Sequence, residues 1–434
     1  MVPSTAPRQS HVHGGLEQPV HRFDLSAASQ IGLDSIVVKD VDRTTLYRIA
    51  DGTLSPLTGP MGISDYESVL ERKAIERDGD LWAWTIPIVL PVTESEFELC
   101  KPGTTVLLMD EAGEIFGNLT VGSSYDWDKE RFLKAVYGTD RTDHDGARLW
   151  LSDERTHLVG GNILLVPSTD ARPFAQYIMG PTQTRKLIED QGWEQSVAFQ
   201  AQNPLQRSHE YALVHGAEAI LRSTGKKTGV VLNPLVSQLN TEEVPAAIRM
   251  ETYEALIRDR ILGKGDADVS LWKSKDQDLN DNLALVGLDM RMFFAGPAEA
   301  VMHAIYRQNM GFTHFIIGRK HAAIPFDDDT QIWGDFDGQQ IFENLEGQLG
   351  IRTVNVGFAA YFEEIGRVGL VSENQGNTAV AITVNKVREH LVAGELPDSR
   401  VMRETTANIL LAFYKTQVEP EPEQEQEPVT EQGS

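Results

Sequence analysis

The stretch that decides the fold covers residues 197–209 and reads Val-Ala-Phe-Gln-Ala-Gln-Asn-Pro-Leu-Gln-Arg-Ser-His. Its apolar beginning predicts a buried strand, and the polar residues that follow predict a loop and then a helix. Asn203 suits the N-cap of that helix, and Pro204 suits its first position. A helix that starts directly after a buried strand presents free N–H groups and a positive dipole end, which favour phosphate. The same pattern also fits an ordinary strand–helix connection.

Beyond this stretch, strand and helix patterns alternate along the chain. The predicted elements are strands at 230–232 and 314–317 and helices at 205–220, 246–261, 298–309, 384–391 and 403–414. Strands that alternate with helices in this way are typical of a parallel sheet of the α/β class.

The first 180 residues have a different pattern. Short β-branched runs with Gly, Pro and Asp between them predict a β-rich region, with strands within 36–49, 84–92 and 105–109. The Glu/Gln/Pro-rich end of the chain has too few apolar residues to form a core. The predicted organisation is a flexible leader (1–25), a β-rich domain (26–180), an α/β domain (181–370), a small helical domain (371–416) and a disordered acidic tail (417–434).

The chain of 434 residues is strongly acidic, with a formal charge of −25 from 39 basic and 64 acidic residues. Six glutamates and no basic residue follow Lys415, which leaves −19 on the rest of the chain. Such a chain is a poor candidate for nucleic-acid binding, which depends on neutralising phosphates. An anionic substrate must therefore be bound by a local group of basic residues.

The same composition bears on location and on metals. No stretch approaches the roughly 20 consecutive apolar residues that span a bilayer, and the first 24 residues lack the apolar core of a secretory signal. Cys100 is the only cysteine, so neither an internal disulfide nor a cysteine-based zinc site is possible. We therefore expect a soluble, cytoplasmic protein that does not bind membranes.

A second informative stretch covers residues 314–322, His-Phe-Ile-Ile-Gly-Arg-Lys-His-Ala. A strand ends at Gly318, and Arg319, Lys320 and His321 follow it directly. The carboxyl ends of the strands in a parallel sheet are where ligands bind. Three basic side chains at such a position in so acidic a protein favour an anion site over a solvated loop.

Three other sequence patterns, a P-loop, a zincin helix and a histidine metal site, do not match their motifs or context. Residues 223–228 resemble a P-loop, but Ile220 stands where the first glycine of that motif belongs. His209-Glu210 could begin a zincin motif, but Leu213 stands where that motif needs its second histidine. His11 and His13 lie in the predicted flexible leader, so we assign no metal site to them. We therefore predict no metal-binding residues.

Five stretches along the chain together resemble a known family. They are residues 54–66 (LSPLTGPMGISDY), 81–92 (LWAWTIPIVLPV), 295–300 (AGPAEA, followed by His303-Ala), 311–319 (GFTHFIIGR) and 333–339 (WGDFDGQ). On these residues the chain resembles the ATP sulfurylase (sulfate adenylyltransferase) family over most of its length. The resemblance implies an N-terminal PUA-like domain, a nucleotidyltransferase-like α/β domain of the Rossmann type and a small helical C-terminal domain. No fused kinase domain is expected, because there is no P-loop.

The chain departs from the family in its two signature loops. The family loop Gln-x-Arg-Asn-Pro-x-His-x-x-His is kept at Gln200, Asn203, Pro204 and His209, but glutamine replaces arginine at 202 and histidine at 206. In the family loop Gly-Arg-Asp-His-Ala-Gly, lysine stands at 320 and alanine at 323. Upstream, Phe293 and Ala298 stand where the family has arginines. Arg291 is a candidate to replace the arginine that is missing at position 293.

The resemblance implies the following site. The residues expected to act in catalysis are Asn203, His209, Arg319 and His321, and those expected to bind substrate are Gln200, Ala201, Gln202, Gln206, Gly318, Lys320, Ala322 and Ala359. His209 and the N–H groups after Asn203 would hold phosphates, and Arg319 with His321 would stabilise the transition state and the leaving group. Gln200, Gln202 and Ala322 would contact the acceptor, and Ala359 the adenine.

The implied reaction is an in-line attack of an oxyanion on the α-phosphorus of ATP, with magnesium pyrophosphate leaving. Mg²⁺ enters with ATP, no tightly bound cofactor is expected, and the chain is a possible homo-oligomer. Three hypotheses remain open. They are adenylylation of sulfate, the same transfer to another acceptor such as phosphate, a phosphonate or an organic acid, and a non-catalytic nucleotide-binding relative.

Overall fold

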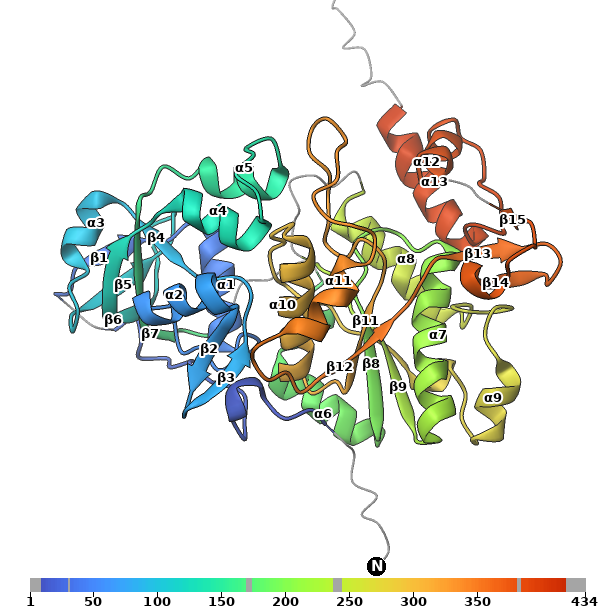
Figure 1. The fold of residues 1–434 in the computed structure, drawn as a ribbon, viewed down its shortest axis with the longest axis horizontal. Helices are drawn as coiled ribbons and strands as arrows, with labels where there is room; N and C mark the ends of the chain where they lie inside the picture. The colour runs from blue at the N-terminus through green and yellow to red at the C-terminus, as the bar shows by residue number, and fades with distance from the viewer. Residues whose placement is uncertain (1–8, 30–31, 169–173, 237–243, 381–383, 419–434) are drawn as a thin grey trace, which may run out of the picture.

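The computed structural model describes residues 9–29, 32–168, 174–236, 244–380 and 384–418. An N-terminal domain lies on one side of a central α/β domain, and a small C-terminal unit lies on the other (Figure 1). The expected α/β fold class is confirmed. The part of the predicted acidic tail from residue 419 onward lies outside the described residues, and α13 includes residues 417 and 418.

The N-terminal domain is built on a five-stranded sheet in the order β1-β5-β6-β7-β4. All neighbours in it are antiparallel except β1 and β5. The strands are β1 (Ser35–Val37), β4 (Leu90–Val92), β5 (Thr105–Met109), β6 (Ile115–Asp126) and β7 (His157–Leu165), with a separate hairpin of β2 (Ala74–Arg77) and β3 (Asp80–Ala83). The helices are α1 (Asp40–Ala50), α2 (Ile63–Arg72), α3 (Glu94–Leu99), α4 (Lys129–Tyr137) and α5 (Asp145–Leu151).

The expected strand within 36–49 is mostly wrong, because only its first residues are extended and α1 begins at Asp40. The buried apolar residues Leu46, Ile49 and Ala50 recur at helical spacing, which an interpretation based on β-branched content missed. The aspartates of the first turn also stabilise the amino end of α1.

The α/β domain has a parallel sheet in the order β10-β9-β8-β11-β12. Its strands are β8 (Gln195–Phe199), β9 (Thr228–Leu232), β10 (Leu283–Leu285), β11 (His314–Ile317) and β12 (Arg352–Asn355). Its helices are α6 (Pro181–Gln191), α7 (Arg207–Thr224), α8 (Ala246–Arg258), α9 (Val269–Ser274), α10 (Gly296–Asn309) and α11 (Asp337–Gln340). The strands and helices predicted after residue 230 are confirmed, with small differences at their ends.

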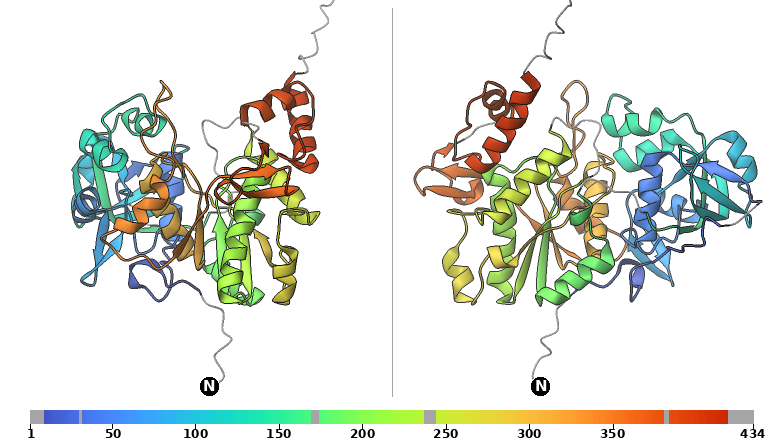
Figure 2. Two further views of the ribbon diagram at one scale, coloured as in Figure 1. Left: turned by 45° about the vertical axis from the view of Figure 1, so that its right-hand side comes forward. Right: turned by 180° about the vertical axis from the view of Figure 1, so that it is seen from behind.

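Alternate residues of the strands face two different cores. On β11, Phe315 and Ile317 belong to the cluster that contains α10, whereas Ile316 belongs to the cluster that contains α7 and α8. Helices therefore cover both faces of the sheet, as Figures 1 and 2 show. The α10 side faces the N-terminal domain and the α7 side faces the C-terminal unit.

The C-terminal unit contains strands as well as the predicted helices. Strands β13 (Ala359–Phe362), β14 (Arg367–Leu370) and β15 (Ala379–Val380) form a small antiparallel sheet. Helix α13 (Glu404–Val418) packs against α8, and α12 (Val384–Val392) packs against α13. Short 3-10 helices cover His13–Gly15, Ala175–Tyr177, Asn280–Asn282, Ile341–Asn344 and Val371–Glu373.

One apolar core crosses the boundary between the N-terminal and α/β domains. The cluster on the α10 face continues without a break into the sheet and helices of the N-terminal domain. Trp150 of α5 stacks on Phe293 of the α/β domain, with ring centroids 5.9 Å apart and planes 8° apart. The hydroxyl of Tyr137 donates to the carbonyl of Phe293 at 2.7 Å. Packing of this kind joins the two domains through their interiors.

The prediction of a flexible leader is wrong for residues 9–25. Ser10 donates its backbone N–H to the carbonyl of Gly311 at 3.1 Å, and the N–H of His13 donates to Oδ1 of Asn309 at 2.9 Å. The imidazole of His13 is buried, lies 2.9 Å from the carbonyl of Ala83, and has its pKa lowered to about 4 by burial. These polar backbone contacts, which composition does not reveal, fasten the segment to the α/β domain.

Candidate active site

The two predicted loops leave neighbouring strands of the parallel sheet. In the register, His314 of β11 pairs with Val197 of β8, and Phe315 pairs with Ala198. From β8 the chain proceeds to β9 and β10 on one side, and it later places β11 on the other side. The strand order thus reverses between β8 and β11, and ligands of open α/β sheets bind in the crevice at such a reversal. The two loops therefore leave adjacent strands at the carboxyl edge of the sheet.

The first loop is longer than expected, because α7 begins at Arg207 with Gln206 as its N-cap. The predicted N-cap, Asn203, is therefore wrong. The carbonyl of Asn203 accepts a hydrogen bond from the hydroxyl of Tyr253 at 2.8 Å, and the carbonyl of Gln202 accepts one from Nη1 of Arg249 at 2.7 Å. These donors on α8 hold residues 202–203 out of helical conformation.

The correct helix start changes which N–H groups are available. The N–H of Arg207, the first helical residue, donates to the carbonyl of Val401 at 2.8 Å. His209 lies in the first turn, where its Nδ1 is 3.5 Å from the N–H of Gln206. Burial lowers the pKa of His209, so its imidazole is neutral at pH 7. It can offer a phosphate an N–H donor but no positive charge.

The glutamines of the first loop face the segment before α10. The Nε2 atoms of Gln200 and Gln202 lie 3.8 and 3.1 Å from Sδ of Met292. Oε1 of Gln200 is buried and has no hydrogen-bond partner in the described part of the chain, and Ala201 between them is buried. A thioether is a weak acceptor, so these amides keep most of their hydrogen-bonding capacity for a ligand.

In the second loop, the positive charges are partly compensated. After Gly318, Nη1 of Arg319 lies 3.4 and 3.5 Å from the two carboxylate oxygens of Asp335. Nζ of Lys320 lies 3.1 Å from Oε1 of Gln331 and 3.8 Å from Asp335. Lys320 and Ala322 have positive φ angles of 49° and 52°, a strained conformation that is frequent at functional sites.

His321 is connected to two residues of α10. Its Nε2 lies 2.9 Å from Nδ1 of His303, and Nε2 of His303 lies 3.3 Å from Oε1 of Glu299. The carboxylate of Glu299 accepts the N–H groups of Phe293 at 2.8 Å and Ala295 at 3.1 Å. Sequence reasoning missed this connection, although a glutamate and a histidine four residues apart on one helix were a visible signal.

Two protein-family models match the chain, and their boundaries agree with the N-terminal and α/β domains described above. Residues 16–168 match the model of the PUA-like domain, and residues 175–413 match the model of the ATP-sulfurylase family. A sulfate adenylyltransferase of Pyropia yezoensis is 61% identical over 407 residues, which cover 93% of this chain and 97% of that protein. The chain belongs to the ATP sulfurylase family.

More distant ATP sulfurylases agree with this assignment. A sulfate adenylyltransferase of Symbiobacterium thermophilum is 33% identical over 87% of the chain and 88% of that protein, and one of a Synechococcus species is 32% identical over 87% and 89%. A solved structure, the hexameric APS kinase from Thiobacillus denitrificans, has a similar fold, with a TM-score of 0.66 and 19% identity over 92% of the chain and 67% of that protein.

The family assignment answers part of the functional question. The chain is a nucleotidyltransferase of the ATP sulfurylase type, with ATP as its substrate, and a non-catalytic role is not favoured. No helix in the described ranges has the length and apolar character of a membrane span. Those same ranges contain no cluster of three or more His, Cys, Asp or Glu side chains arranged to hold a metal ion.

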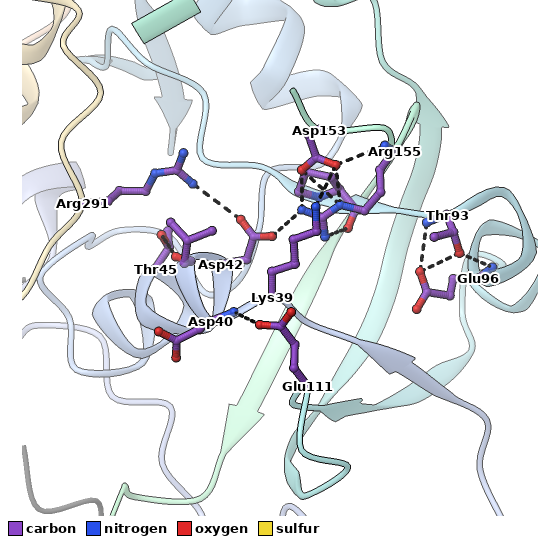
Figure 3. A network of polar contacts seen from close by, with 12 residues as sticks. Lys39, Asp40, Asp42, Thr45, Thr93, Glu96, Glu111, Asp153, Arg155 and Arg291 are labelled. Atoms are coloured by element: carbon purple, nitrogen blue, oxygen red, sulfur yellow. Dashed lines mark hydrogen bonds and ion pairs between the residues drawn. The ribbon is translucent and has the colours of Figure 1, made fainter. Parts of the chain in front are cut away.

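Arg291 does not replace a missing ATP sulfurylase arginine, so this interpretation is wrong. Its Nη1 lies 3.6 Å from Oδ1 of Asp42, whose other oxygen accepts Nη2 of Arg155 at 2.7 Å. Figure 3 shows Asp42 between these two arginines. The guanidinium of Arg291 also lies 4.7 Å above the ring of Trp150. This arginine is directed into the N-terminal domain.

The residue predicted to meet adenine lies at the start of β13. Ala359 is half-buried and pairs with Leu370. The ring of its neighbour Phe358 lies 4.1 Å from the guanidinium of Arg319. This contact places the segment before β13 next to the second loop.

Proposed function

We propose that this ATP sulfurylase transfers the adenylyl group of ATP to sulfate, with adenylyl sulfate and pyrophosphate as products. The observation that carries the proposal is the meeting of the Gln200–Gln202 loop and the Arg319–His321 loop at the point where strand order reverses. Relatives named sulfate adenylyltransferase, one of them 61% identical, support sulfate as the acceptor.

The proposed roles follow from the donors that each loop offers. Arg319 supplies the positive charge for the α-phosphate and the leaving pyrophosphate, and His321 supplies a neutral donor beside it. Gln200 and Gln202, whose side-chain amides contact the thioether of Met292, bind the acceptor with the backbone of Ala322. Such a site acts by holding sulfate and the α-phosphorus in line and by stabilising charge in the transition state.

The remaining predicted residues support the phosphates and the base. Gln206 and His209 lie at the amino end of α7, whose dipole favours the triphosphate. Asn203, Gly318 and Lys320 shape the two loops, and Ala359 lies where adenine would bind. Mg²⁺ would enter as part of the MgATP substrate complex and would neutralise charge on the leaving pyrophosphate.

Pyrophosphate release measures this function directly. The purified enzyme is given ATP, GTP, CTP or UTP with sulfate, phosphate, a phosphonate or an organic acid, and the adenylylated product is identified by mass. ATP with sulfate should have the highest kcat/KM. A higher kcat/KM with another oxyanion would instead select that compound as the acceptor. Homo-oligomerisation stays a prediction, which light scattering on the same preparation tests.

A further inference from the structure

Three titratable side chains form a line from α10 to the end of β11. Glu299 and His303 lie one turn apart on α10 and are 0% and 1% exposed. His303 contacts Glu299 through Nε2 and His321 through Nδ1, at 3.3 and 2.9 Å. His321 is partly exposed beside Arg319, so this line joins the interior to the proposed site.

The contact between the two imidazoles fixes a direction of donation, because only one of the two nitrogens can carry the proton. With Glu299 ionised, Nε2–H of His303 donates to the carboxylate, and Nδ1 of His303 must accept from Nε2–H of His321. Nδ1 of His321 then carries a lone pair. One added proton on Glu299 reverses both hydrogen bonds, whereas one on His303 reverses only the bond between the two imidazoles. In either case Nδ1 of His321 becomes an N–H donor.

The free end of this line is Nδ1 of His321. It has no hydrogen-bond partner among the residues that the structure describes. Phosphate oxygens accept hydrogen bonds, so they bind an N–H donor at this position and are repelled by a lone pair. Only the protonated line therefore presents a group that suits the nucleotide.

We propose that Glu299 and His303 are positioning residues that set which hydrogen-bonding group His321 presents, and that ATP binding takes up one proton into this line. The inference rests on the proposed function, in which His321 contacts the phosphates. The proposal gives a role to the buried carboxylate of Glu299. Among the described residues, its only basic partner at salt-bridge distance is His303.

The surroundings set the pH at which this happens. Burial raises the pKa of Glu299 to about 7 and lowers that of His303 well below its usual value. The charged and titratable groups that act electrostatically on the line are Arg307 and Tyr306 of α10, Arg291 of the preceding segment and Tyr137 of α4. Burial lowers the pKa of Arg307 to about 9 and raises the pKa of both tyrosines. Between pH 6 and 8 we therefore assign proton uptake to the Glu299–His303 pair.

Calorimetric titration with MgATP tests the proposal. Binding is measured at pH 6.5, 7.25 and 8 in two buffers of different ionisation enthalpy, which gives the number of protons taken up. We expect uptake to approach one proton at pH 8 and Kd to rise by up to tenfold per pH unit above about 7.

Substitution of Glu299 distinguishes control of the proton on His321 from a purely structural role. In Glu299→Gln the amide can donate to His303 and imitate the protonated line, so proton uptake should disappear and Kd should no longer depend on pH. Glu218→Gln is the matched control, because Glu218 is also a buried glutamate with a raised pKa, but it lies on α7 against Trp272. That variant should keep the uptake. Equal uptake in Glu299→Gln and the unsubstituted enzyme would overturn the proposal.

A second measurement uses the unsubstituted protein and does not depend on the folding of a variant. Nitrogen-15 spectra of histidine-labelled enzyme, assigned with His321→Asn, report whether Nδ1 of His321 carries a proton. We expect it to change from lone pair to N–H as the pH falls through about 7. A state that is constant from pH 6 to 8 would contradict the inference. Both readouts are independent of turnover, so failed sulfate-dependent pyrophosphate release would count against the proposed function alone.

Discussion

Arg319 is held in place and yet keeps donors for a substrate. Its contacts with Asp335, at 3.4 and 3.5 Å, are longer than the 2.7–2.9 Å typical of a charge-assisted pair. The side chain is 40% exposed and its guanidinium lies over the ring of Phe358. The aromatic contact orients the group, and the loose ion pair leaves its N–H groups able to turn toward a phosphate.

Replacement of Arg319 by alanine should therefore lower kcat by about 10²–10³-fold, the loss typical of a missing transition-state donor. His209→Ala should have an effect of the same size through the lost phosphate contact. Thermal unfolding should change little for Arg319→Ala, because the residue is on the surface. Arg258→Ala is a control, since Arg258 is an exposed arginine paired with Asp259 far from the site. Turnover that is unchanged in both site variants would refute these roles.

Gln202 stands where the resemblance to the family implies an arginine in the acceptor site. An amide carries no charge, whereas a bidentate arginine contact with sulfate is worth about 1.5–3 kcal/mol. Sulfate should therefore bind weakly in this enzyme, and Gln202→Arg should lower the KM for sulfate by one to two orders of magnitude. Lys320→Ala should lower activity with the true acceptor. Steady-state kinetics with sulfate as the varied substrate measure both effects. Tight sulfate binding that Gln202→Arg does not improve would contradict this expectation.

At the scale of elements, the first turn of α7 is anchored to the C-terminal unit. Nε of Arg403 donates to both carboxylate oxygens of Glu210, at 2.9 and 2.7 Å, and the N–H of Gly263 donates to the same group at 2.8 Å. Arg207 forms a parallel pair with Asp266, with Nη2 and Oδ1 2.6 Å apart. Both carboxylates are fully buried. The helix that carries His209 therefore depends on residues about 190 positions away in the sequence.

Arg403→Met should destabilise the enzyme by about 3 kcal/mol, because it leaves Glu210 buried without its partner. The pKa of Glu210 is already raised by burial and is held down by Arg403. Without the arginine it rises further, so the folded variant binds a proton more strongly than the unfolded chain, and stability is lost as pH rises. Urea unfolding should show a larger loss at pH 8 than at pH 5, and Arg403→Lys should lose less. A deficit of equal size at both pH values would mean that the pair has no electrostatic role.

Elements with buried apolar runs could be predicted from the sequence, and the start of α7 could not. The strand at 314–317 was predicted to the residue, because it is buried on both faces. The Asn203-Pro204 signal for a helix start is local, and the hydrogen bonds from Tyr253 and Arg249 that override it come from another helix. The connection from His321 to Glu299 likewise depends on how α10 packs against β11, which no local pattern contains.

At the scale of the whole molecule, the N-terminal and α/β domains share one core. Asn309 of α10 joins three segments, since it accepts from His13 and donates to the carbonyls of Thr53 and Ser55, each at 2.9 Å. Arg48 of α1 lies 3.9 Å from Asp289 in the segment before α10. Neither domain can leave the other without exposing apolar surface and unpaired buried polar groups.

Calorimetry of the whole chain should therefore show one cooperative transition for these two domains. Residues 175–434 expressed alone should aggregate, because the α10 face loses its cover. The Asn309→Ala variant, which leaves several buried groups unpaired, should lower the temperature of that same transition by several degrees. Two separate transitions, only one of them moved by Asn309→Ala, would show that the domains unfold independently.

The stacking of Phe293 on Trp150 has a consequence for attempts to re-engineer this enzyme toward its family consensus. Phe293 and Ala298 stand where the resemblance to the family implies arginines, and both are part of the interdomain core, at 2% and 4% exposed. An arginine at position 293 would place a cation against Trp150, and one at position 298 would place a cation in the same buried core. Either change would push the domains apart. Gln202 lies outside that core. Directed evolution of acceptor affinity should therefore begin at the strand β8 loop and leave the domain junction as it is.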